Sequence, residues 1–430
     1  MQVTIEKIVY PGKSLSRAEG QVIFTDEGLP GELVEIEIIK DKKNYLEART
    51  LKILKSSPFR QKPLCTHYQA CSPYQIMSYE LELKIKSQQL SEIISRFLHL
   101  ENKIIELIPA PSTIGYRDRI GLSLSWDQKP PVLSYHLPGS REAFLPVENC
   151  ALVSSEVNAL ISKLNTLLPE TPLPAIQHLE IRQSYWTKEI LLVLFSKEEE
   201  SLRKAQKLWV PALSLDPLIV GVIGAVESPK KTKYLKLSGR NYLEERINQT
   251  VFRYGPGCFF QVNPPMLEKV ITRIKNYLDS RPFGKMVDLY AGIGTFGLLL
   301  ADKASEILSI EAVPENLYYL KKNLRLNRLG HLTVAEGRSE EFLEEIQSFR
   351  PDSVVVDPPR KGLAPELIET LKKIKAQFLF YLSCNPTTLA RDLNLLLADY
   401  ELEEITGFDF FPRTPHIEVL ARLKAKKDNH

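Results

Sequence analysis

Three segments in the last third of the chain carry side chains that can do chemistry. Cys384 lies in the motif SCNP, directly after the apolar run FLFYL, and Asp357 lies in DPPR, directly after SVVV. Glu418 stands between two apolar residues in HIEVL. A thiolate is a nucleophile, and a carboxylate in apolar surroundings gains a raised pKa that suits a general base. Taken singly, Glu418 is more typical of a surface strand acid, and Asp357 is as typical of a turn cap as of a functional carboxylate. Beside a reactive Cys384, the same residues would suit covalent chemistry assisted by proton transfer.

The surroundings of Cys384 leave two interpretations open. Most single cysteines that follow an apolar strand are buried and unreactive. Here Asn385 and Pro386 end the strand directly after the thiol, and Thr387 is expected to cap a helix over residues 388–397. The amino terminus of a helix stabilises a thiolate, so these residues predict a nucleophile as readily as a buried structural cysteine.

A glycine-rich segment, DLYAGIGTFG over residues 288–297, predicts a cofactor loop. Gly292, Gly294 and Gly297 match the G-x-G-x-x-G fingerprint, and Glu311 follows Gly292 by nineteen residues, where an acid that binds a ribose diol is expected. A nicotinamide dinucleotide and S-adenosylmethionine both carry that ribose. Asp288 favours S-adenosylmethionine, because a carboxylate opposes a pyrophosphate but attracts a cationic methionine group.

The elements around these motifs predict a doubly wound α/β domain. From about residue 266, helices alternate with the strands KMVDLY, ILSIEAV, LTVAE, SVVVDPP and FLFYLSC. Strands separated by helices of roughly 10–15 residues indicate βαβ units and a parallel sheet. Ligands of open α/β sheets bind at the carboxyl ends of the strands. We therefore expect Asp357, Cys384 and the glycine loop at one edge of this sheet.

The rest of the chain predicts two further domains. Residues 1–57 contain short alternating β-branched segments separated by glycine and proline, which is typical of a small oligonucleotide-binding (OB-like) barrel. Residues 58–250 predict a mixed α+β central domain that begins with a helix over 78–98. Residues 251–430 then form the catalytic domain.

Composition excludes several classes of protein. The 430 residues are 43% hydrophobic and 25% charged with a net charge of +3, which excludes collagen, a disulfide scaffold and bulk disorder. Apolar runs such as LIVGVIGAV stop short of the roughly 20 residues that span a bilayer. No secretory signal begins the chain, and the five cysteines are an odd number. We expect a cytoplasmic monomer with reduced thiols and no membrane contact.

Taken together, the motifs resemble the RNA 5-methyluridine (uracil-C5) methyltransferase family, in particular its 23S ribosomal RNA branch. The first domain is similar to a TRAM domain, and GYR and FFQVN are followed in family order by DLYAGIGTFG, DPPRKGL, LSCNPTTLARDL and FPRTPHIE. The resemblance covers nearly the whole chain. It implies a Rossmann-like methyltransferase domain that uses S-adenosylmethionine to methylate uridine C5 in RNA, with 23S rRNA as the expected substrate.

The resemblance also assigns roles to individual residues. Cys384 is implied as the nucleophile that adds to uracil C6, and Glu418 as the acceptor of the C5 proton. Asp357 is implied to line the active-site cradle. The residues implied to bind S-adenosylmethionine are Gln261, Tyr290, Gly292, Gly294, Thr295 and Glu311.

Two basic stretches are expected to face the RNA. Residues 40–62 contain eight Lys or Arg and two acids, 8 − 2 = +6, and residues 230–240 contain five cations and no acid. Phe410 and Phe411 are candidates for contact with a base that has left its stack, with core packing expected for at least one of them.

The sequence departs from the family pattern at two places, the iron–sulfur ligands and the contact to the adenine of the cofactor. The ribosomal branch often carries a four-cysteine iron–sulfur cluster, and Cys65, Cys71 and Cys150 match three of those ligands. Tyr74 stands where the remaining cysteine is expected, so the set is one thiolate short. Arg338 replaces the acid or amide expected near the adenine. A nicotinamide oxidoreductase and a non-catalytic RNA-binding protein on the same scaffold stay open as alternatives.

Overall fold

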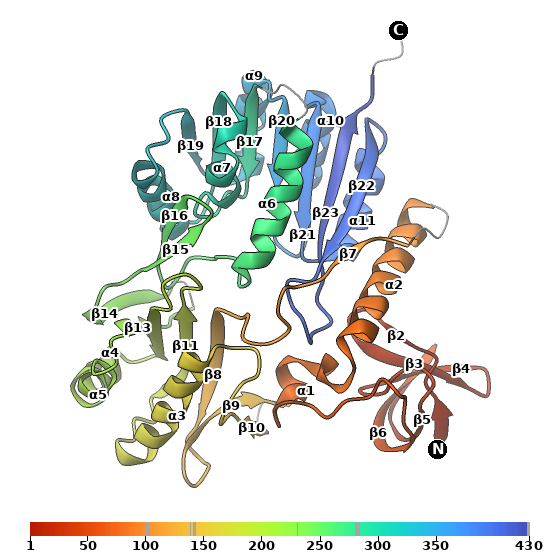
Figure 1. Cartoon of the computed structure of the whole chain (residues 1–430), viewed down its shortest axis with the longest axis vertical. Coiled ribbons are helices and arrows are strands. Elements are labelled where there is room, and N and C mark those ends of the chain that lie inside the picture. Colours follow the sequence, from red (N-terminus) through yellow and green to blue (C-terminus); the bar gives the residue numbers. More distant parts are fainter. Residues whose placement is uncertain (100–103, 138, 141–142, 230, 280–283, 428–430) are drawn as a thin grey trace.

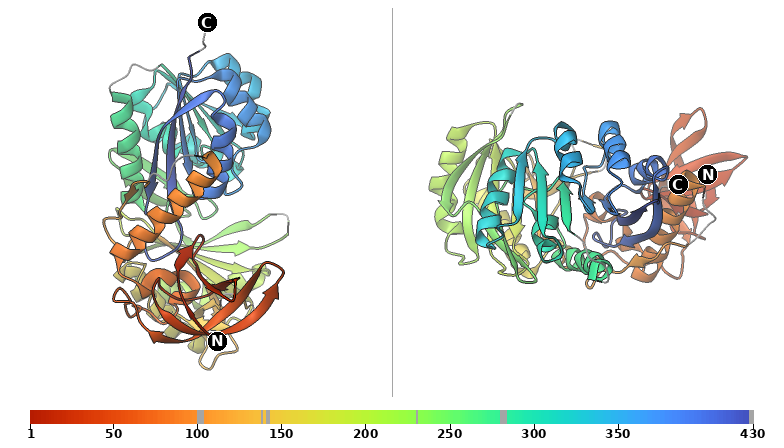
Figure 2. Two further views of the ribbon diagram at one scale, coloured as in Figure 1. Left: turned by 90° about the vertical axis from the view of Figure 1, so that its right-hand side faces the viewer. Right: turned by 90° about the horizontal axis from the view of Figure 1, so that it is seen from above.

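The computed structural model describes residues 1–99, 104–137, 139–140, 143–229, 231–279 and 284–427. These residues form a six-stranded barrel sheet, a seven-stranded central sheet, a two-stranded hairpin and an eight-stranded carboxyl-terminal sheet (Figure 1). Figure 2 shows that the barrel and the central sheet both lie at the same end of the carboxyl-terminal domain. Within the described ranges, no helix combines the length and apolar character needed to cross a bilayer.

The amino-terminal barrel is all β, as its alternating sequence predicts. Inward-facing residues such as Val3, Ile23 and Val34 form its core, because alternate side chains of a strand point to the same face. The strand order is β1-β5-β6-β4-β3-β2. The strands are β1 (Gln2–Thr4), β2 (Lys7–Val9), β3 (Lys13–Ala18), β4 (Gln21–Thr25), β5 (Leu33–Lys42) and β6 (Tyr45–Lys55).

The cations of the basic stretch 40–62 are exposed, except Arg60. That guanidinium donates to Glu32 Oε1 at 2.6 Å and to Glu27 Oε1 at 2.8 Å. Because Glu32 is fully buried, Arg60 neutralises an internal charge and is not available to RNA, contrary to our prediction. The exposed cations of the stretch are Lys40, Lys42, Lys43, Arg49, Lys52, Lys55 and Lys62.

The central part combines a mixed sheet with helices in one hydrophobic core, as expected for an α+β domain. The helices α3 (Ser155–Glu170), α4 (Glu199–Leu208) and α5 (Val210–Leu213) share that core with the sheet. The strand order is β10-β9-β8-β11-β12-β13-β14. The strands are β8 (Arg119–Ser125), β9 (Val132–His136), β10 (Phe144–Pro146), β11 (Ile176–Gln183), β12 (Ile190–Ser196), β13 (Ile219–Val226) and β14 (Lys233–Gly239).

The carboxyl-terminal sheet has the order β19-β18-β17-β20-β21-β23-β22-β7. The first five strands are parallel, which confirms the parallel sheet predicted for them, whereas β23 runs antiparallel to both β21 and β22, so the complete sheet is mixed. The strands are β7 (Leu107–Ile108), β17 (Lys285–Leu289), β18 (Glu306–Glu311), β19 (Leu332–Glu336), β20 (Ser353–Val356), β21 (Phe378–Ser383), β22 (Tyr400–Phe408) and β23 (Glu418–Ala425).

Helices cover both faces of this sheet. Successive residues of β21 contribute to two different cores, with Phe380 in one and Tyr381 in the other, as expected for a buried strand. One face carries α6 (Pro264–Asp279) and α7 (Thr295–Leu299), and the other carries α10 (Pro365–Ile374) and α11 (Pro386–Leu396). The structure therefore confirms the doubly wound, Rossmann-like arrangement.

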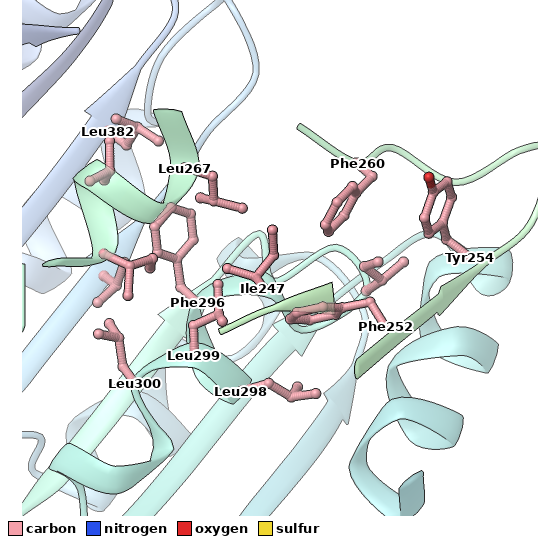
Figure 3. Close-up of a cluster of buried hydrophobic side chains, with 14 of the residues drawn as sticks. Ile247, Phe252, Tyr254, Phe260, Leu267, Phe296, Leu298, Leu299, Leu300 and Leu382 are labelled. Carbon is pink, nitrogen blue, oxygen red and sulfur yellow. The ribbon is translucent and has the colours of Figure 1, made fainter. Parts of the chain in front are cut away.

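A hydrophobic cluster joins the cofactor loop to the two-stranded hairpin β15 (Leu243–Ile247) and β16 (Thr250–Tyr254). Figure 3 shows Phe296 and Leu299 of α7 close to Ile247 and Phe252 of the hairpin. The helix that follows the glycine loop is thus packed against the segment that connects the central part to the catalytic domain.

Helix α2 (Tyr79–Leu98) links the amino-terminal half to the catalytic sheet. Ser78 caps it by accepting from Leu81 N at 3.3 Å, which agrees with the predicted helix over 78–98. The chain beyond α2 forms β7, which pairs with β22. We retain the division at residues 57 and 250 as a proposal, with α2 and β7 attached to the catalytic sheet.

A buried ionic cluster holds α2 against the loop over residues 409–417, which leads into β23. The fully buried Lys86 ammonium donates to Glu82 Oε1 and to Asp409 Oδ1, both at 2.7 Å. Glu82 Oε1 also accepts from Arg413 N at 2.7 Å, and Tyr79 OH donates to Asp409 Oδ2 at 2.8 Å. Charges enclosed in this way are stabilising only as a complete set.

Replacing Lys86 with methionine is expected to destabilise the protein by about 3–5 kcal/mol, because it removes the ammonium that pairs with two buried carboxylates and leaves Glu82 only the more distant Arg413 guanidinium at 3.7 Å. Urea unfolding followed by intrinsic fluorescence measures this loss. Lys84→Met is the matched control, since Lys84 lies on the same helix but is exposed. Equal unfolding midpoints for the two variants would show that the cluster does not stabilise the fold.

Candidate active site

Cys384 and Glu418 face each other at the ends of two neighbouring antiparallel strands. Ser383, the last residue of β21, pairs with Val419 of β23. Continuing this register by one residue places Cys384 opposite Glu418, and directly opposed residues of antiparallel strands point to the same face. The β-strand edge thus brings the predicted nucleophile and the predicted base together.

The Cys384 thiol lies in a half-buried position among charged groups. Burial is the main cause that raises its pKa to about 11, and the carboxyl groups of Glu418 and Asp357 raise it further. The guanidinium of Arg360 opposes this shift. We did not assign Arg360 a role from the sequence, although its position in DPPR, three residues after Asp357, was the available signal.

Glu418 is a buried carboxyl group with the properties of a proton acceptor. Burial raises its pKa well above the usual value, the neighbouring Asp357 adds to the shift, and Arg360 opposes it. Its Oε2 atom has no hydrogen-bond partner among the described residues. Glu418 is the first residue of β23, so His416 lies in the loop before the strand.

The helix after Cys384 begins earlier than its sequence predicts. Asn385, not Thr387, caps α11, by accepting from Thr387 N at 3.2 Å, and Pro386 occupies the first helical position. The Asn385 Nδ2 group also donates to Arg360 O at 3.0 Å. The cap thereby joins the SCNP loop to the DPPR loop and leaves the thiol beside a helix amino terminus.

The glycine loop adopts the backbone that its sequence predicts. Gly292 and Gly294 have φ angles of 58° and 91°, in the left-handed region that glycine tolerates. Gly297 donates from its N–H to Asp288 Oδ2 at 2.9 Å, and a Cβ atom there would lie 2.8 Å from Ser309 Oγ. The loop thus closes over β17 too tightly for a side chain at position 297, and α7 begins at Thr295.

Glu311 stands at the end of β18, next to the glycine loop. One carboxylate oxygen accepts from Gly292 N at 2.7 Å, and the other accepts from Ala312 N at 2.9 Å and Val313 N at 2.6 Å. These amides fix an acidic group at the strand end where a ribose diol is expected.

Tyr290 and Glu340 form a pair that the sequence did not indicate. Tyr290 has a φ angle of 59°, and its hydroxyl donates to Glu340 Oε1 at 2.9 Å. Glu340 lies two residues beyond Arg338, the position where the family pattern has an acid or amide. An acidic side chain is therefore present in this region although Arg338 replaces the expected one.

Gln261 and Asp357 form a hydrogen-bonded pair beyond the end of β20. Gln261 Nε2 donates to Asp357 Oδ2 at 3.2 Å, and burial raises the pKa of Asp357 to about 7. Asn263 Nδ2 donates to Phe410 O at 3.0 Å, so the FFQVN segment also contacts the loop before β23. Phe410 is fully buried in the core, whereas Phe411 is partly exposed.

The amino-terminal barrel reaches the catalytic residues through one turn. Tyr10, between β2 and β3, lies close enough to Cys384 and Glu418 that their charges raise its pKa, after the larger effect of burial. Two residues later, a Cβ atom at Gly12 would lie 3.0 Å from Pro415 Cβ. This contact joins positions about 400 residues apart, and no local pattern predicts it.

The three cysteines expected as metal ligands lie together with a histidine. The charges of Cys65 and Cys150 raise the pKa of His67 to about 9 against the effect of burial, and Cys71 interacts with Cys150. Tyr74 packs in a different cluster. Among the residues that the structure describes, no group of three or more Cys, His, Asp or Glu is arranged to hold a metal ion. With three thiols, the set does not fit an iron–sulfur cluster.

The raised pKa of Cys384 predicts alkaline-dependent alkylation. Because the pKa is about 11, the thiolate fraction should rise about tenfold per pH unit from pH 7 to pH 10. Arg360→Ala removes the cation that lowers this pKa, so alkylation at fixed pH should slow. Iodoacetamide labelling, followed by peptide mass spectrometry of the Cys384 peptide, measures both effects.

Lys361→Ala is the control for this labelling experiment, since Lys361 is an exposed neighbouring cation. The same slowing in Lys361→Ala and Arg360→Ala would contradict a specific effect of the Arg360 guanidinium.

The fold and the site together define the class of protein. A doubly wound sheet with a glycine loop, an acid after the second strand and a Cys–Glu pair at the same edge has the organisation of a Rossmann-like methyltransferase domain. The family model described as tRNA (Uracil-5-)-methyltransferase matches residues 78–426, and the TRAM domain model matches residues 1–51. The chain belongs to the tRNA (uracil-5-)-methyltransferase family and is an RNA methyltransferase that uses S-adenosylmethionine.

Similar proteins extend over the whole chain. An uncharacterized RNA methyltransferase of Oceanobacillus iheyensis is 27% identical over 453 residues, which cover 99% of this chain and 97% of the relative. One from Enterococcus faecalis is 29% identical over 454 residues and covers 100% and 98%. The solved tRNA (uracil-54, C5)-methyltransferase of Pyrococcus abyssi, in complex with S-adenosyl-L-homocysteine, is 24% identical with a TM-score of 0.76 and covers 98% and 99%.

Proposed function

We propose that this protein methylates C5 of a uridine in RNA through a covalent bond between Cys384 and uracil C6. The observation that carries the proposal is the register that places Cys384 opposite Glu418, at the same sheet edge as the glycine loop. A nicotinamide oxidoreductase would need neither this thiol nor this base. Family membership also favours methyl transfer over that alternative.

The nucleophile is required because uracil C5 is a poor carbon nucleophile. The Cys384 thiolate forms a bond to C6, and the electron pair of the C5–C6 double bond makes C5 nucleophilic. S-adenosylmethionine supplies the methyl group that C5 takes up. Arg360 stabilises negative charge near the sulfur, because its guanidinium opposes the high pKa of Cys384.

Release of the product requires a base at C5. Once methylated, C5 still carries its proton, and Glu418 accepts that proton through a carboxylate oxygen that has no hydrogen-bond donor in the part of the chain that the structure describes. The C5–H electron pair restores the double bond, the C6–S bond breaks, and Cys384 leaves as a thiolate. The raised pKa of Glu418 makes its carboxylate a stronger proton acceptor than an exposed one.

The cofactor is assigned to the residues around the glycine loop. Glu311 is positioned by three backbone amides to bind the ribose diol, and a hydrogen bond joins Gln261 to Asp357. The left-handed glycines allow the backbone to approach the cofactor closely. The glycine loop itself contains the other residues implied to bind the cofactor, which are Tyr290, Gly292, Gly294 and Thr295.

RNA is expected to approach from the side of the barrel and the central sheet. The barrel stretch 40–62 has seven exposed cations that can attract phosphates. Tyr10 of the barrel lies close enough to Cys384 and Glu418 to feel their charges. In the second stretch, Arg240 pairs with Glu189, and Lys233 pairs with Glu199 at the surface. Lys230 lies outside the described residues. Lys231 and Lys236 remain exposed.

We propose 23S rRNA as the first substrate, following the resemblance to the ribosomal branch, with transfer RNA as the alternative. Unmodified transcripts of both RNAs, incubated with the protein and methyl-labelled cofactor, test this choice. Incorporation into 23S rRNA supports it. Incorporation into transfer RNA alone would reject the ribosomal substrate while retaining the chemistry.

A further inference from the structure

The turn between β11 and β12 exposes two neighbouring aromatic side chains. Tyr185 is 43% exposed and Trp186 is 51% exposed, although large aromatic residues usually contribute to a core or an interface. Neither ring belongs to a hydrophobic cluster of the described residues. Packing of the fold therefore does not explain their presence.

A cation accompanies each ring. The Lys188 ammonium lies 4.4 Å from the centroid of Tyr185, and the Arg246 guanidinium lies 5.3 Å from the centroid of Trp186. Exposed aromatic rings paired with cations are suited to nucleic acid, because the rings stack on bases while the cations attract the phosphates. A peptide partner or a second copy of this chain would not require this repeated pairing.

The turn is fixed by a buried carboxylate. Glu245 of β15 is fully buried, and it accepts from Tyr185 N at 2.5 Å, Trp186 N at 3.0 Å and Arg246 N at 2.9 Å. Ser184 and Glu189 close the base of the turn with a hydrogen bond of 2.9 Å. The two rings are thus presented on a rigid backbone, which lowers the entropy lost when they bind.

Backbone hydrogen bonds link the base of the turn to the segment that contacts Asp357. Gln183, two residues before Tyr185, donates from its N–H to Asp118 O at 2.7 Å, and Asp118 N donates to Val262 O at 3.3 Å. Val262 directly follows Gln261, which contacts Asp357. In Figure 1, β15, whose Glu245 holds the turn, lies between the central sheet and the catalytic sheet, so the turn is at the junction of these two sheets.

We propose that Tyr185 and Trp186 form a stacking platform for unpaired nucleotides of the substrate RNA, close to the uridine that is modified. This inference rests on the proposed function and adds a specific RNA contact to it. The platform would hold bases that flank the target after the local RNA structure has opened, with Lys188 and Arg246 against the backbone phosphates.

Filter binding and methyl-transfer kinetics of Trp186→Ala and of the Tyr185→Ala/Trp186→Ala double variant test the platform. The RNA probes are full-length 23S rRNA and total transfer RNA, both transcribed without modification. For the RNA that the protein methylates, we expect Kd and KM to rise about tenfold, since stacking contributes roughly 1–3 kcal/mol per base. The kcat at saturating RNA and the Kd for S-adenosylhomocysteine should stay within twofold.

Two variants separate stacking from an effect on folding. Trp186→Phe keeps an aromatic ring and should recover most of the RNA affinity. Leu215→Ala removes another exposed apolar side chain, 81% exposed, from the surface beyond α5, and should change nothing. An unchanged Kd and KM in the double variant would overturn the platform and leave a protein partner as the occupant of this turn. An equal loss in Leu215→Ala would overturn it as well.

Failure of the proposed function gives a different result. If the unmodified protein transfers no methyl group, the proposed function fails, while the RNA affinities of the variants still test the platform.

Discussion

Replacing Cys384 with alanine is expected to abolish methyl transfer, with a loss of about a thousandfold or more, because uracil C5 is then no longer activated. RNA that contains 5-fluorouridine makes this loss directly visible. The carbon–fluorine bond at C5 cannot be broken by Glu418, so the unmodified protein should remain covalently attached to the RNA through the Cys384–C6 bond. Denaturing electrophoresis with labelled cofactor detects that complex, and Cys384→Ala should not form it.

Cys258→Ala provides the matched control for this experiment. Cys258 is buried beside the FFQVN segment, and burial raises the pKa of its thiol to about 12. Since its thiol has no role in the proposed reaction, this variant should form the covalent complex as the unmodified protein does. Trapping by Cys384→Ala at the normal rate would show that another group is the nucleophile.

Replacing Glu418 with glutamine is expected to block a later step than the Cys384 variant. The amide keeps the shape of the side chain but cannot accept the C5 proton, so turnover should fall by about 10²- to 10⁴-fold. Ordinary uridine RNA should then receive one methyl group per protein and remain bound to Cys384. Gel detection of this complex, together with single-turnover methyl incorporation, measures the effect.

The two variants make opposite predictions for the covalent complex, which is absent in Cys384→Ala and persistent in Glu418→Gln. Glu401→Gln is the control, because Glu401 is an exposed acid on the neighbouring strand β22. Normal release of methylated RNA by Glu418→Gln would assign the proton to a different acceptor.

Local patterns account for much of the fold that the sequence predicted. The alternation of apolar strands with helices defines βαβ units one at a time, and glycine at positions 292 and 294 allows the left-handed backbone that the loop adopts. Each of these features depends on residues within one turn or one strand. For this reason the parallel part of the sheet, the cofactor loop and helix α2 agree with their predictions.

Features that depend on distant parts of the chain were not predicted. The antiparallel insertion of β23 beside β21 is set by packing in the whole sheet, and it is this arrangement that brings Glu418 opposite Cys384. The pairing of Arg60 with the buried Glu32 depends on how the barrel closes. A basic residue in the sequence therefore indicates charge but not whether that charge is free to meet RNA.

Tyr10 is a residue of the site whose position could not be predicted from the local sequence. Nothing near Tyr10 in the sequence indicates chemistry, yet the fold brings it into the electrostatic neighbourhood of Cys384 and Glu418. His67 likewise joins three cysteines that local spacing related only to one another. Side chains that join a site only through tertiary contacts can be identified only once those contacts are known.

Nucleoside analysis of the product RNA tests the central claim most directly. Unmodified 23S rRNA and transfer RNA would be incubated with the protein and S-adenosylmethionine that carries a deuterated methyl group, then digested and analysed by mass spectrometry. The proposed reaction predicts 5-methyluridine that contains all three deuterons of the methyl group, because the only proton lost is the one on C5. Deuterated methyl groups on another atom or another base, with no labelled 5-methyluridine, would contradict it.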